Sequence, residues 1–294
     1  MNIDLVNKIK RITIIALASD DELVETLVLK GGNAIDLAYT PTNDTVSRTS
    51  YDLDYSIDDG DFNEDEITIS KRIEATLMQT FLENDFVIID YKFLNKPKNI
   101  REEVADFWGG YKVEFKVIGK ILYDEYKGNI DNLRRRAVSV NPNESPVFEL
   151  EFSKFEHVGQ KVAIDVEGYK IYVYTPEMIV FEKLRAICQQ LPGYRDIIPS
   201  FSPRARARDF YDIHLIWEMH EINPATKANI ELIQNIFLAK KVPLRFIKEI
   251  RNNKSLHIDN WQSVKDTISP YEKLEDFDFY FDFVLQRFED ITFP

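Results

Sequence analysis

The spacing of apolar residues differs between the two halves of this chain. The first half shows both helical and strand-like spacing, and the second half shows mainly helical spacing. Residues 4–18 and about 67–83 place their apolar side chains on one helical face. Runs in which apolar and polar positions alternate predict strands. The expected strands cover residues 51–57, 86–93, 110–118, 147–153 and 169–175. From Thr175 onward the helical spacing dominates, so we predict an α+β fold with an N-terminal domain at 1–174 and a mostly helical one at 175–294.

Two helices in the second half begin with local start signals. Thr175 precedes a proline and a glutamate, which is the order of an N-cap, a first helical position and an acid in the first turn. We expect the helix that follows to cover residues 176–190. Ser202-Pro203 predicts the start of a second helix in the same way.

Two glycines near the N-terminus separate a short apolar run from a short predicted helix. The run covers residues 27–30, Gly31 and Gly32 form a tight turn, and the helix covers 33–39. Glycines in this place let a phosphate approach the backbone N–H groups at the positive end of the helix dipole. The next residue is Asn33 and not the lysine of a nucleotide-binding P-loop. The pair is therefore a candidate phosphate site, and a plain turn explains it equally well.

Two aspartates lie one residue apart in the strand predicted at 51–57. Side chains at positions i and i+2 of a strand project to the same side, so Asp52 and Asp54 share a face while Leu53 packs behind them. Mg²⁺ suits such a pair, because it binds one or two carboxylates together with phosphate oxygens of a substrate. The alternative is that both aspartates are exposed residues at the end of a strand.

A third acid usually completes a metal site of this kind, and two of the predicted strands offer one. In residues 147–153 the apolar side chains face the core, so Glu149 and Glu151 face away from it. In residues 110–118, Glu114 alternates with apolar neighbours in the same way. The alternation alone does not choose between these strands.

A lysine in the first C-terminal helix lies at the edge of an apolar stripe. That stripe is formed by Val180, Leu184, Ile187 and Leu191. Lys183 can pack its stem there and hold its ammonium in water, while Glu182 and Arg185 fall on the far side of the helix. In the next helix, Asp209 and Asp212 are neighbours at the edge of the core. An acid in such a place needs a basic partner, and Lys183 is a candidate for Asp209.

Charge and composition narrow the class of protein. The formal net charge of −13 excludes a general nucleic-acid coat. Basic clusters at 133–137 and 202–209 can steer a polyanion locally, or they are solvated faces with acidic neighbours. The apolar runs are too short to span a bilayer and we expect no signal peptide. A single cysteine, Cys188, excludes an intrachain disulfide and fits a reducing cytosol, so we expect a cytoplasmic protein.

Five segments, taken in order, resemble the AbiEii-type nucleotidyltransferase toxins, the enzymatic half of type IV toxin–antitoxin and abortive-infection systems. The matching pieces are LKGGNAIDLAY, SYDLDYSI, FELEFS, YTPEMIVFEKLRAI and RARDFYDIHLI. They extend from residue 29 to about 216. That family belongs to the DNA polymerase β-like nucleotidyltransferase superfamily. The resemblance implies a mixed sheet with flanking helices in the N-terminal lobe, and a helical lobe that contributes to a shared cleft.

The resemblance also implies roles for individual residues. The family's glycine motif holds the nucleoside triphosphate, its D-x-D strand and a further acid hold two Mg²⁺ ions, and a lysine and an acid of its helical lobe complete the site. In this chain those residues are Gly31, Gly32 and Asn33 for phosphate, Asp52, Asp54 and Glu151 for metal with Glu114 as the alternative third acid, and Lys183, Arg208 and Asp209 in the helical lobe. The family usually has Ser or Thr where this chain has Asn33.

We therefore expect a Mg²⁺-dependent enzyme that moves a nucleotide from an NTP to an acceptor, by the resemblance a tRNA or another RNA. It would act as a toxin that a separately encoded antitoxin opposes, without a membrane partner. Asp54, Lys183 and Asp209 would be the catalytic residues, and Arg208 would contact phosphate or the RNA. The alternatives are a superfamily relative that modifies a small molecule or a protein, an inactive relative that binds a nucleotide or a partner, and a purely structural interaction protein.

Overall fold

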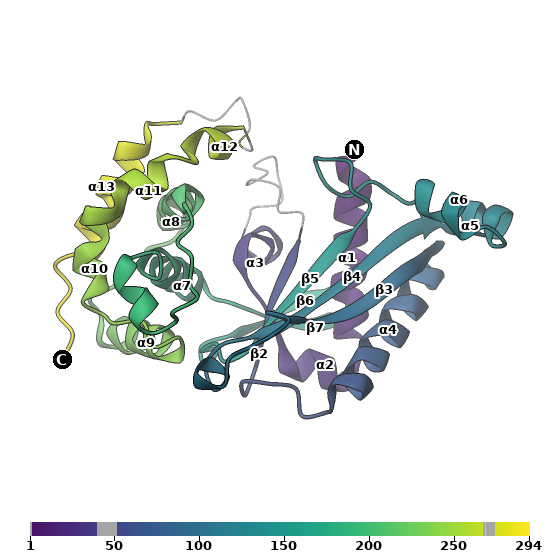
Figure 1. Cartoon of the computed structure of the whole chain (residues 1–294), viewed down its shortest axis with the longest axis horizontal. Helices are drawn as coiled ribbons and strands as arrows, with labels where there is room; N and C mark the ends of the chain where they lie inside the picture. The colour runs from purple at the N-terminus through teal and green to yellow at the C-terminus, as the bar shows by residue number, and fades with distance from the viewer. Residues whose placement is uncertain (1, 40–51, 267, 269–273) are drawn as a thin grey trace. The chain divides into compact units, whose positions relative to one another are not determined.

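The computed structural model describes residues 2–39, 52–266, 268 and 274–294 (Figure 1). Tyr51, the first residue of one predicted strand, lies outside them. The chain forms two compact units, and each is discontinuous in sequence. The first, called the sheet unit, comprises Met1–Ala34, Ser50–Phe155 and Lys161–Val173. The second, called the helical unit, comprises Ile35–Thr49, Glu156–Gln160 and Tyr174–Pro294. The predicted domain boundary after residue 174 stays a prediction.

The sheet unit is built on one mixed sheet, which has seven strands within the described residues, in the order β3-β4-β5-β2-β1-β7-β6. The strands are β1 (Leu27–Leu29), β2 (Leu53–Ile57), β3 (Phe86–Lys96), β4 (Gly110–Gly119), β5 (Phe148–Ser153), β6 (Val162–Val166) and β7 (Tyr169–Val173). β2 runs parallel to β5, and β1 runs parallel to β7. The other neighbouring strands are antiparallel. The predicted α+β class with a mixed sheet is confirmed.

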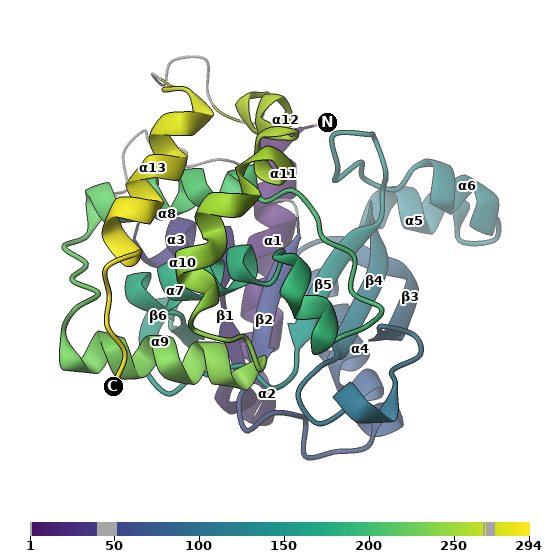
Figure 2. The same ribbon diagram turned by 60° about the vertical axis from the view of Figure 1, so that its left-hand side comes forward.

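Helices cover one face of this sheet (Figures 1 and 2). They are α1 (Ile3–Ala18), α2 (Asp21–Thr26) and α4 (Glu66–Glu83). The chain also forms α3 (Gly31–Ala38), whose residues from Ile35 onward belong to the helical unit, α5 (Lys120–Tyr126), α6 (Ile130–Arg135) and a 3-10 turn at Glu102–Val104. The ring of Phe81 on α4 contacts Phe115 of β4, which in turn contacts Phe148 of β5. Because burial alternates along β5, its glutamates project from the opposite face.

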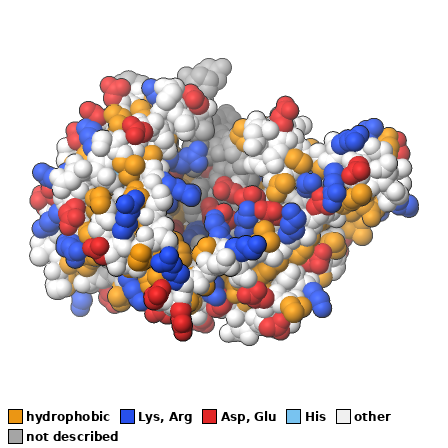
Figure 3. Space-filling view, in the orientation of Figure 1, with side chains coloured by type: hydrophobic (Ala, Val, Ile, Leu, Met, Phe, Trp, Pro, Cys, Tyr) orange, Lys and Arg blue, Asp and Glu red, His pale blue; other side chains and the backbone are white. Residues whose placement is uncertain are grey.

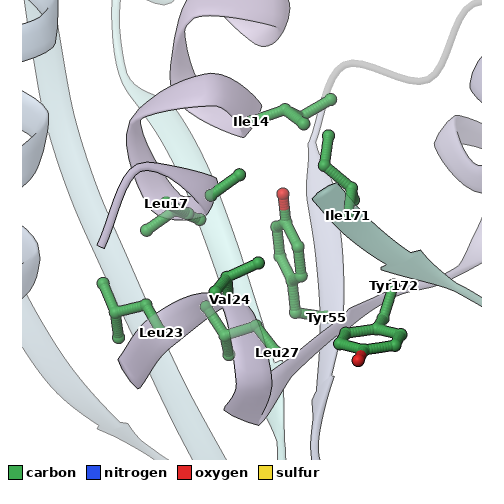
Figure 4. A pocket seen from close by; sticks show the side chains of 9 residues that line it. Ile14, Leu17, Leu23, Val24, Leu27, Tyr55, Ile171 and Tyr172 are labelled. Carbon is green, nitrogen blue, oxygen red and sulfur yellow. The ribbon is translucent and has the colours of Figure 1, made fainter. Parts of the chain in front are cut away.

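A small cavity lies on the helix-covered face, among α1, α2, β1, β2 and β7 (Figure 4). Its volume of about 10 Å³ is at the lower limit of what a single water molecule needs. The hydroxyl of Tyr55 points into it, is buried, and has no hydrogen-bond partner among the described residues. Burial raises the pKa of the Tyr55 hydroxyl. Because Tyr55 follows Asp54 in β2, the cavity and the Asp54 side chain belong to opposite faces of the sheet.

The helical unit packs around aromatic side chains. Its elements are α7 (Pro176–Cys188), α8 (Ala207–Met219), α9 (Lys227–Ala239), α10 (Phe246–Glu249), α11 (Lys254–Ile258), α12 (Trp261–Lys265) and α13 (Phe277–Phe288), with 3-10 turns at Pro192–Asp196 and Ile250–Asn253. Phe210 of α8 stacks against Phe281 and meets Phe277 edge-on, which joins α8 to α13. None of the described helices has the length and apolar character needed to span a membrane.

The two predicted helix starts have different outcomes. The hydroxyl of Thr175 accepts the N–H of Met178 at 3.3 Å, so the predicted start of α7 is confirmed. The start predicted at Ser202-Pro203 is wrong, because α8 begins at Ala207. Its first N–H groups are bound by side chains about fifty residues farther along the chain, which no local pattern can reveal.

Arg185 of α7 is buried, although the spacing places it on the side of the helix away from the apolar stripe. Its guanidinium lies 3.4 Å from Glu156 and 3.3 Å from Glu182. Lys240, also buried, lies 3.4 Å from the other carboxylate oxygen of Glu156. These charged groups offset one another, which makes their burial tolerable. The cluster explains why residues 156–160, which follow β5, belong to the helical unit.

Candidate active site

In the sheet unit, α3 begins directly after β1, at the turn formed by the glycine pair. Gly31 has a φ of +67°, which is in the left-handed region that favours glycine. A Cβ on Gly31 would lie 3.5 Å from the Asp54 Oδ2 atom, in ordinary van der Waals contact. The backbone N–H of Lys30 donates to the carbonyl of Asp54 at 2.9 Å. The glycine turn and the D-x-D strand are therefore neighbours in space.

Asn33 joins this turn to the start of β2. Its side-chain amide donates to the backbone carbonyl of Asp52 at 2.6 Å, and its side-chain oxygen accepts from the ammonium of Lys10 at 3.1 Å. Asn33 and Lys10 are both buried. Because both ends of the Asn33 side chain are engaged within the protein, a phosphate contact by this residue falls to its backbone.

Asp54 and Glu151 lie side by side on the face of the sheet away from α1 and α4. They are direct partners in the parallel pairing of β2 with β5. Both side chains are partly buried and alternate with buried neighbours. Glu151 also forms an ion pair with Lys96 of β3. Asp52 precedes β2 and is exposed, so the structure brings one acid of the D-x-D pair into register with Glu151.

Glu114 occupies a place one strand farther from Asp54. It lies on β4, opposite Glu149 of β5, and it pairs with Lys112 and, at 3.8 Å, with Lys92. Acidic and basic side chains are in fact interleaved over the sheet unit (Figure 3). The strand order thus makes Glu151, and not Glu114, the neighbour of Asp54.

The acidic side chains on this face of the sheet can be compared with the ligands that a metal ion requires. In the described part of the chain, no three His, Cys, Asp or Glu side chains come together closely enough to hold a metal ion. The candidate metal ligands are therefore the two neighbouring carboxylates of Asp54 and Glu151. Mg²⁺ takes one or two carboxylates and completes its shell with substrate phosphates and water, so this pair fits it.

Lys30 is a second basic residue of this region that the sequence patterns missed. It is buried at the end of β1, and its ammonium donates to the hydroxyl of Ser153 at the end of β5 with a distance of 3.1 Å. The bond extends across β2, which lies between these two strands. A lysine directly before a glycine pair was the available signal for it. The candidate site therefore has buried positive charge from Lys10 and Lys30 as well as acids.

The helical unit holds a separate cluster around Lys183. Its ammonium lies 3.1 Å from Asp209 and 2.7 Å from Asp212, and both carboxylates are buried. The predicted pair of Lys183 with Asp209 is therefore present, and 14% of the Lys183 side chain remains exposed. Arg206 binds the second oxygen of Asp209 at 3.2 Å. Arg208 is exposed on the first turn of α8.

The sequence patterns did not predict that Asp212 binds Lys183 or that Arg206 binds Asp209. Asp212 lies one helical turn after Asp209, so the signal for it was the three-residue spacing of the two acids. Two acids and two bases balance one another, and removal of Lys183 leaves two buried carboxylates without their shared base.

Known structures share this fold. The crystal structure of JHP933 from Helicobacter pylori is similar with a TM-score of 0.50 at 17% identity, covering 96% of this chain and 90% of that one. A protein described as a candidate nucleotidyltransferase from H. pylori is similar with a TM-score of 0.51 at 17% identity, covering 97% and 93%. A search of curated protein sequences gave no significant match.

A protein family matches nearly the whole chain. Its description is nucleotidyl transferase AbiEii toxin, type IV toxin–antitoxin system, and the match extends over residues 14–283. The matched range includes both the Asp54–Glu151 pair and the Lys183 cluster. The chain therefore belongs to the AbiEii family of type IV toxin–antitoxin systems and is a nucleotidyltransferase.

Proposed function

We propose that this nucleotidyltransferase moves a nucleotide from an NTP to an RNA acceptor such as tRNA, that it requires Mg²⁺, and that the transfer makes it a toxin. Family membership supports nucleotidyl transfer, an NTP substrate, a toxin role and an antitoxin partner. The observation that carries the proposal is the in-register pair of Asp54 and Glu151 beside the turn at Gly31.

The carboxylates of Asp54 and Glu151 would hold Mg²⁺ together with phosphate oxygens of the substrate, and Asp52 would be the further acid that the family resemblance implies for a second ion. Bound Mg²⁺ would supply charge neutralisation at the triphosphate and favour the attacking form of the acceptor hydroxyl. The backbone N–H groups of Gly31, Gly32 and Asn33 would face the phosphate at the start of α3. In the transfer, the acceptor oxygen bonds to the α-phosphorus, its proton is released, and the bond to pyrophosphate breaks.

The cluster in the helical unit would serve the triphosphate. Lys183 would neutralise its negative charge, and Asp209 would hold and orient the ammonium. The two acids around Lys183 support this role, because two buried carboxylates fix the position of the cation between them. The exposed side chain of Arg208 would contact phosphate or the RNA acceptor.

The test is to incubate the protein with each labelled NTP, Mg²⁺ and a total RNA pool, beside Asp54→Asn and the matched variant Glu114→Gln. We expect label on RNA with the unaltered protein and with Glu114→Gln, and none with Asp54→Asn. Label on the protein itself or on a small molecule would contradict the RNA acceptor. Label that persists in Asp54→Asn would contradict the assigned site, and no label anywhere would contradict the transfer reaction.

A further inference from the structure

The start of α8 is capped by side chains from a distant part of the chain. Arg206 is at the N-cap position, and its side chain makes no capping bond to the helix in the described structure. Instead, the Nδ1 atom of His257 accepts the backbone N–H of Arg206 at 3.1 Å. The side-chain oxygen of Asn260 accepts the N–H of Ala207 at 3.2 Å. His257 lies on α11 and Asn260 precedes α12.

His257 lies in the interior of the helical unit, where Nδ1 accepts the bond from Arg206. Its side chain is completely buried, and its ring packs 5.1 Å from that of Phe210, measured between centroids. Burial, as the main cause, lowers the pKa of His257 to about 4, so the imidazole is neutral at neutral pH. Because Nδ1 accepts a hydrogen bond, the proton resides on Nε2, which has no partner among the described residues.

The capped segment leads directly to the charged cluster. Asp209 is the third residue of α8, so the place where the helix starts determines where its carboxylate lies. Arg206, whose backbone His257 holds, binds the Oδ2 atom of Asp209. Lys183 binds the Oδ1 atom of the same carboxylate. A shift of the helix start would therefore move both bases relative to Asp209.

We propose that His257 and Asn260 are positioning residues, which hold the start of α8 so that Asp209 orients Lys183 toward the triphosphate. The proposal rests on the proposed role of Lys183. Neither residue touches the substrate in this scheme, and both act through the backbone of α8. Loss of the cap is expected to weaken triphosphate binding more than it slows the transfer.

The test compares variants that remove the acceptor with variants that keep it. His257→Phe retains a ring of similar size without an acceptor, whereas Asn in place of His257 returns an oxygen near the position of Nδ1. Asn260→Ala and Asn260→Asp form the same contrast at the second site. The first readout is amide hydrogen exchange at Arg206 and Ala207, and the second is the split between KM for the NTP and kcat.

We expect His257→Phe and Asn260→Ala to speed exchange at these amides about tenfold, the usual size of a lost helix cap, and to raise KM for the NTP. His257→Asn and Asn260→Asp should stay near the unaltered protein. His214→Phe is the matched control, because His214 lies on α8 and contacts Phe279 and Phe283 without a bond to the cap. It should leave both readouts unchanged.

Three results would overturn the proposal. The cap is wrong if exchange at Arg206 and Ala207 stays slow in His257→Phe and Asn260→Ala. The positioning role is wrong if exchange is fast but KM is unaltered. Equal defects in His257→Phe and His257→Asn would mean that the ring packs and does not cap. Lys183→Gln tests the role of Lys183 separately from the cap. An unaltered KM in this variant would contradict the role of Lys183 in triphosphate binding, while amide exchange in the His257 and Asn260 variants would still show whether these residues cap α8.

Discussion

The side-chain amide of Asn33 holds the backbone of Asp52, with 2.6 Å between Nδ2 and the carbonyl oxygen. The other end of the same side chain accepts from the buried ammonium of Lys10 at 3.1 Å. One residue thus ties α1, the glycine turn and the strand with the candidate metal acids into a single arrangement. A serine hydroxyl at this position is too short to replace both contacts.

Replacing Asn33 with Ser should therefore lower both stability and metal affinity. We expect a loss of about 1–3 kcal/mol in the free energy of unfolding, since a buried donor or acceptor is left unpaired. Urea unfolding measures this, and Mn²⁺ binding followed by electron paramagnetic resonance measures the affinity independently of activity. Asn33→Asp, which keeps an acceptor for Lys10 and loses the donor to Asp52, separates the two contacts. Unaltered Mn²⁺ binding in both variants would show that the bond to Asp52 does not position the acids.

The two candidate third acids should respond differently to neutralisation. Glu151→Gln removes a carboxylate that is in register with Asp54, whereas Glu114→Gln removes one on the next strand. We expect Glu151→Gln to reduce transfer by more than the about 10–100-fold typical of outer-shell partners of a metal, and Glu114→Gln to change it little. Initial rates over a range of Mg²⁺ concentrations provide the measurement. The reverse order of effects would assign the third position to Glu114.

The Lys183 cluster should behave as one energetic unit. Lys183→Met leaves two buried carboxylates without their shared base, and we expect a loss of about 3–5 kcal/mol in the free energy of unfolding. Adding Asp209→Asn to this variant should recover part of the loss, because one of the uncompensated charges is then gone. A double-mutant cycle by denaturant unfolding tests the coupling. Strictly additive effects would mean that the two side chains do not depend on each other.

His257 should make stability depend on pH. Its pKa is lowered from 6.5 to about 4 in the folded state, so between these values the unfolded chain binds a proton that the folded chain does not. Its contribution is therefore present above pH 6.5 and is lost as the pH falls toward 4, by about 3 kcal/mol in total. Unfolding measured from pH 4 to 7 should show the slope, and His257→Phe should remove that component. An identical slope in the variant would assign the effect to other groups.

Local patterns predict the longer elements of this fold, since α1, α4 and α7 each show several turns of one apolar face. They miss α2, α5, α6 and β6, which are too short to display a period. They also misplace the start of α8, because its cap comes from His257 and Asn260. For the start of α8 the limit is that the deciding contacts are not local.

The candidate site shows the same limit. That Asp52 and Asp54 share a face follows from strand alternation alone. The choice between Glu151 and Glu114 requires the strand order, which depends on a parallel pairing between segments almost a hundred residues apart. The burial of Lys10 beneath Asn33 likewise depends on how α1 meets the glycine turn, and the spacing of residues along α1 does not contain that information.

The buried bonds of Glu156 affect how this protein could be divided or recombined. The residue precedes the last two strands of the sheet unit, but its partners Arg185 and Lys240 come from α7 and the end of α9. A fragment that ended at residue 174 would keep the acid and lose both bases. An exchange of the helical half between relatives would therefore separate Glu156 from both bases unless residues 156–160 were exchanged with it, so the two units are not interchangeable by a single cut in the chain.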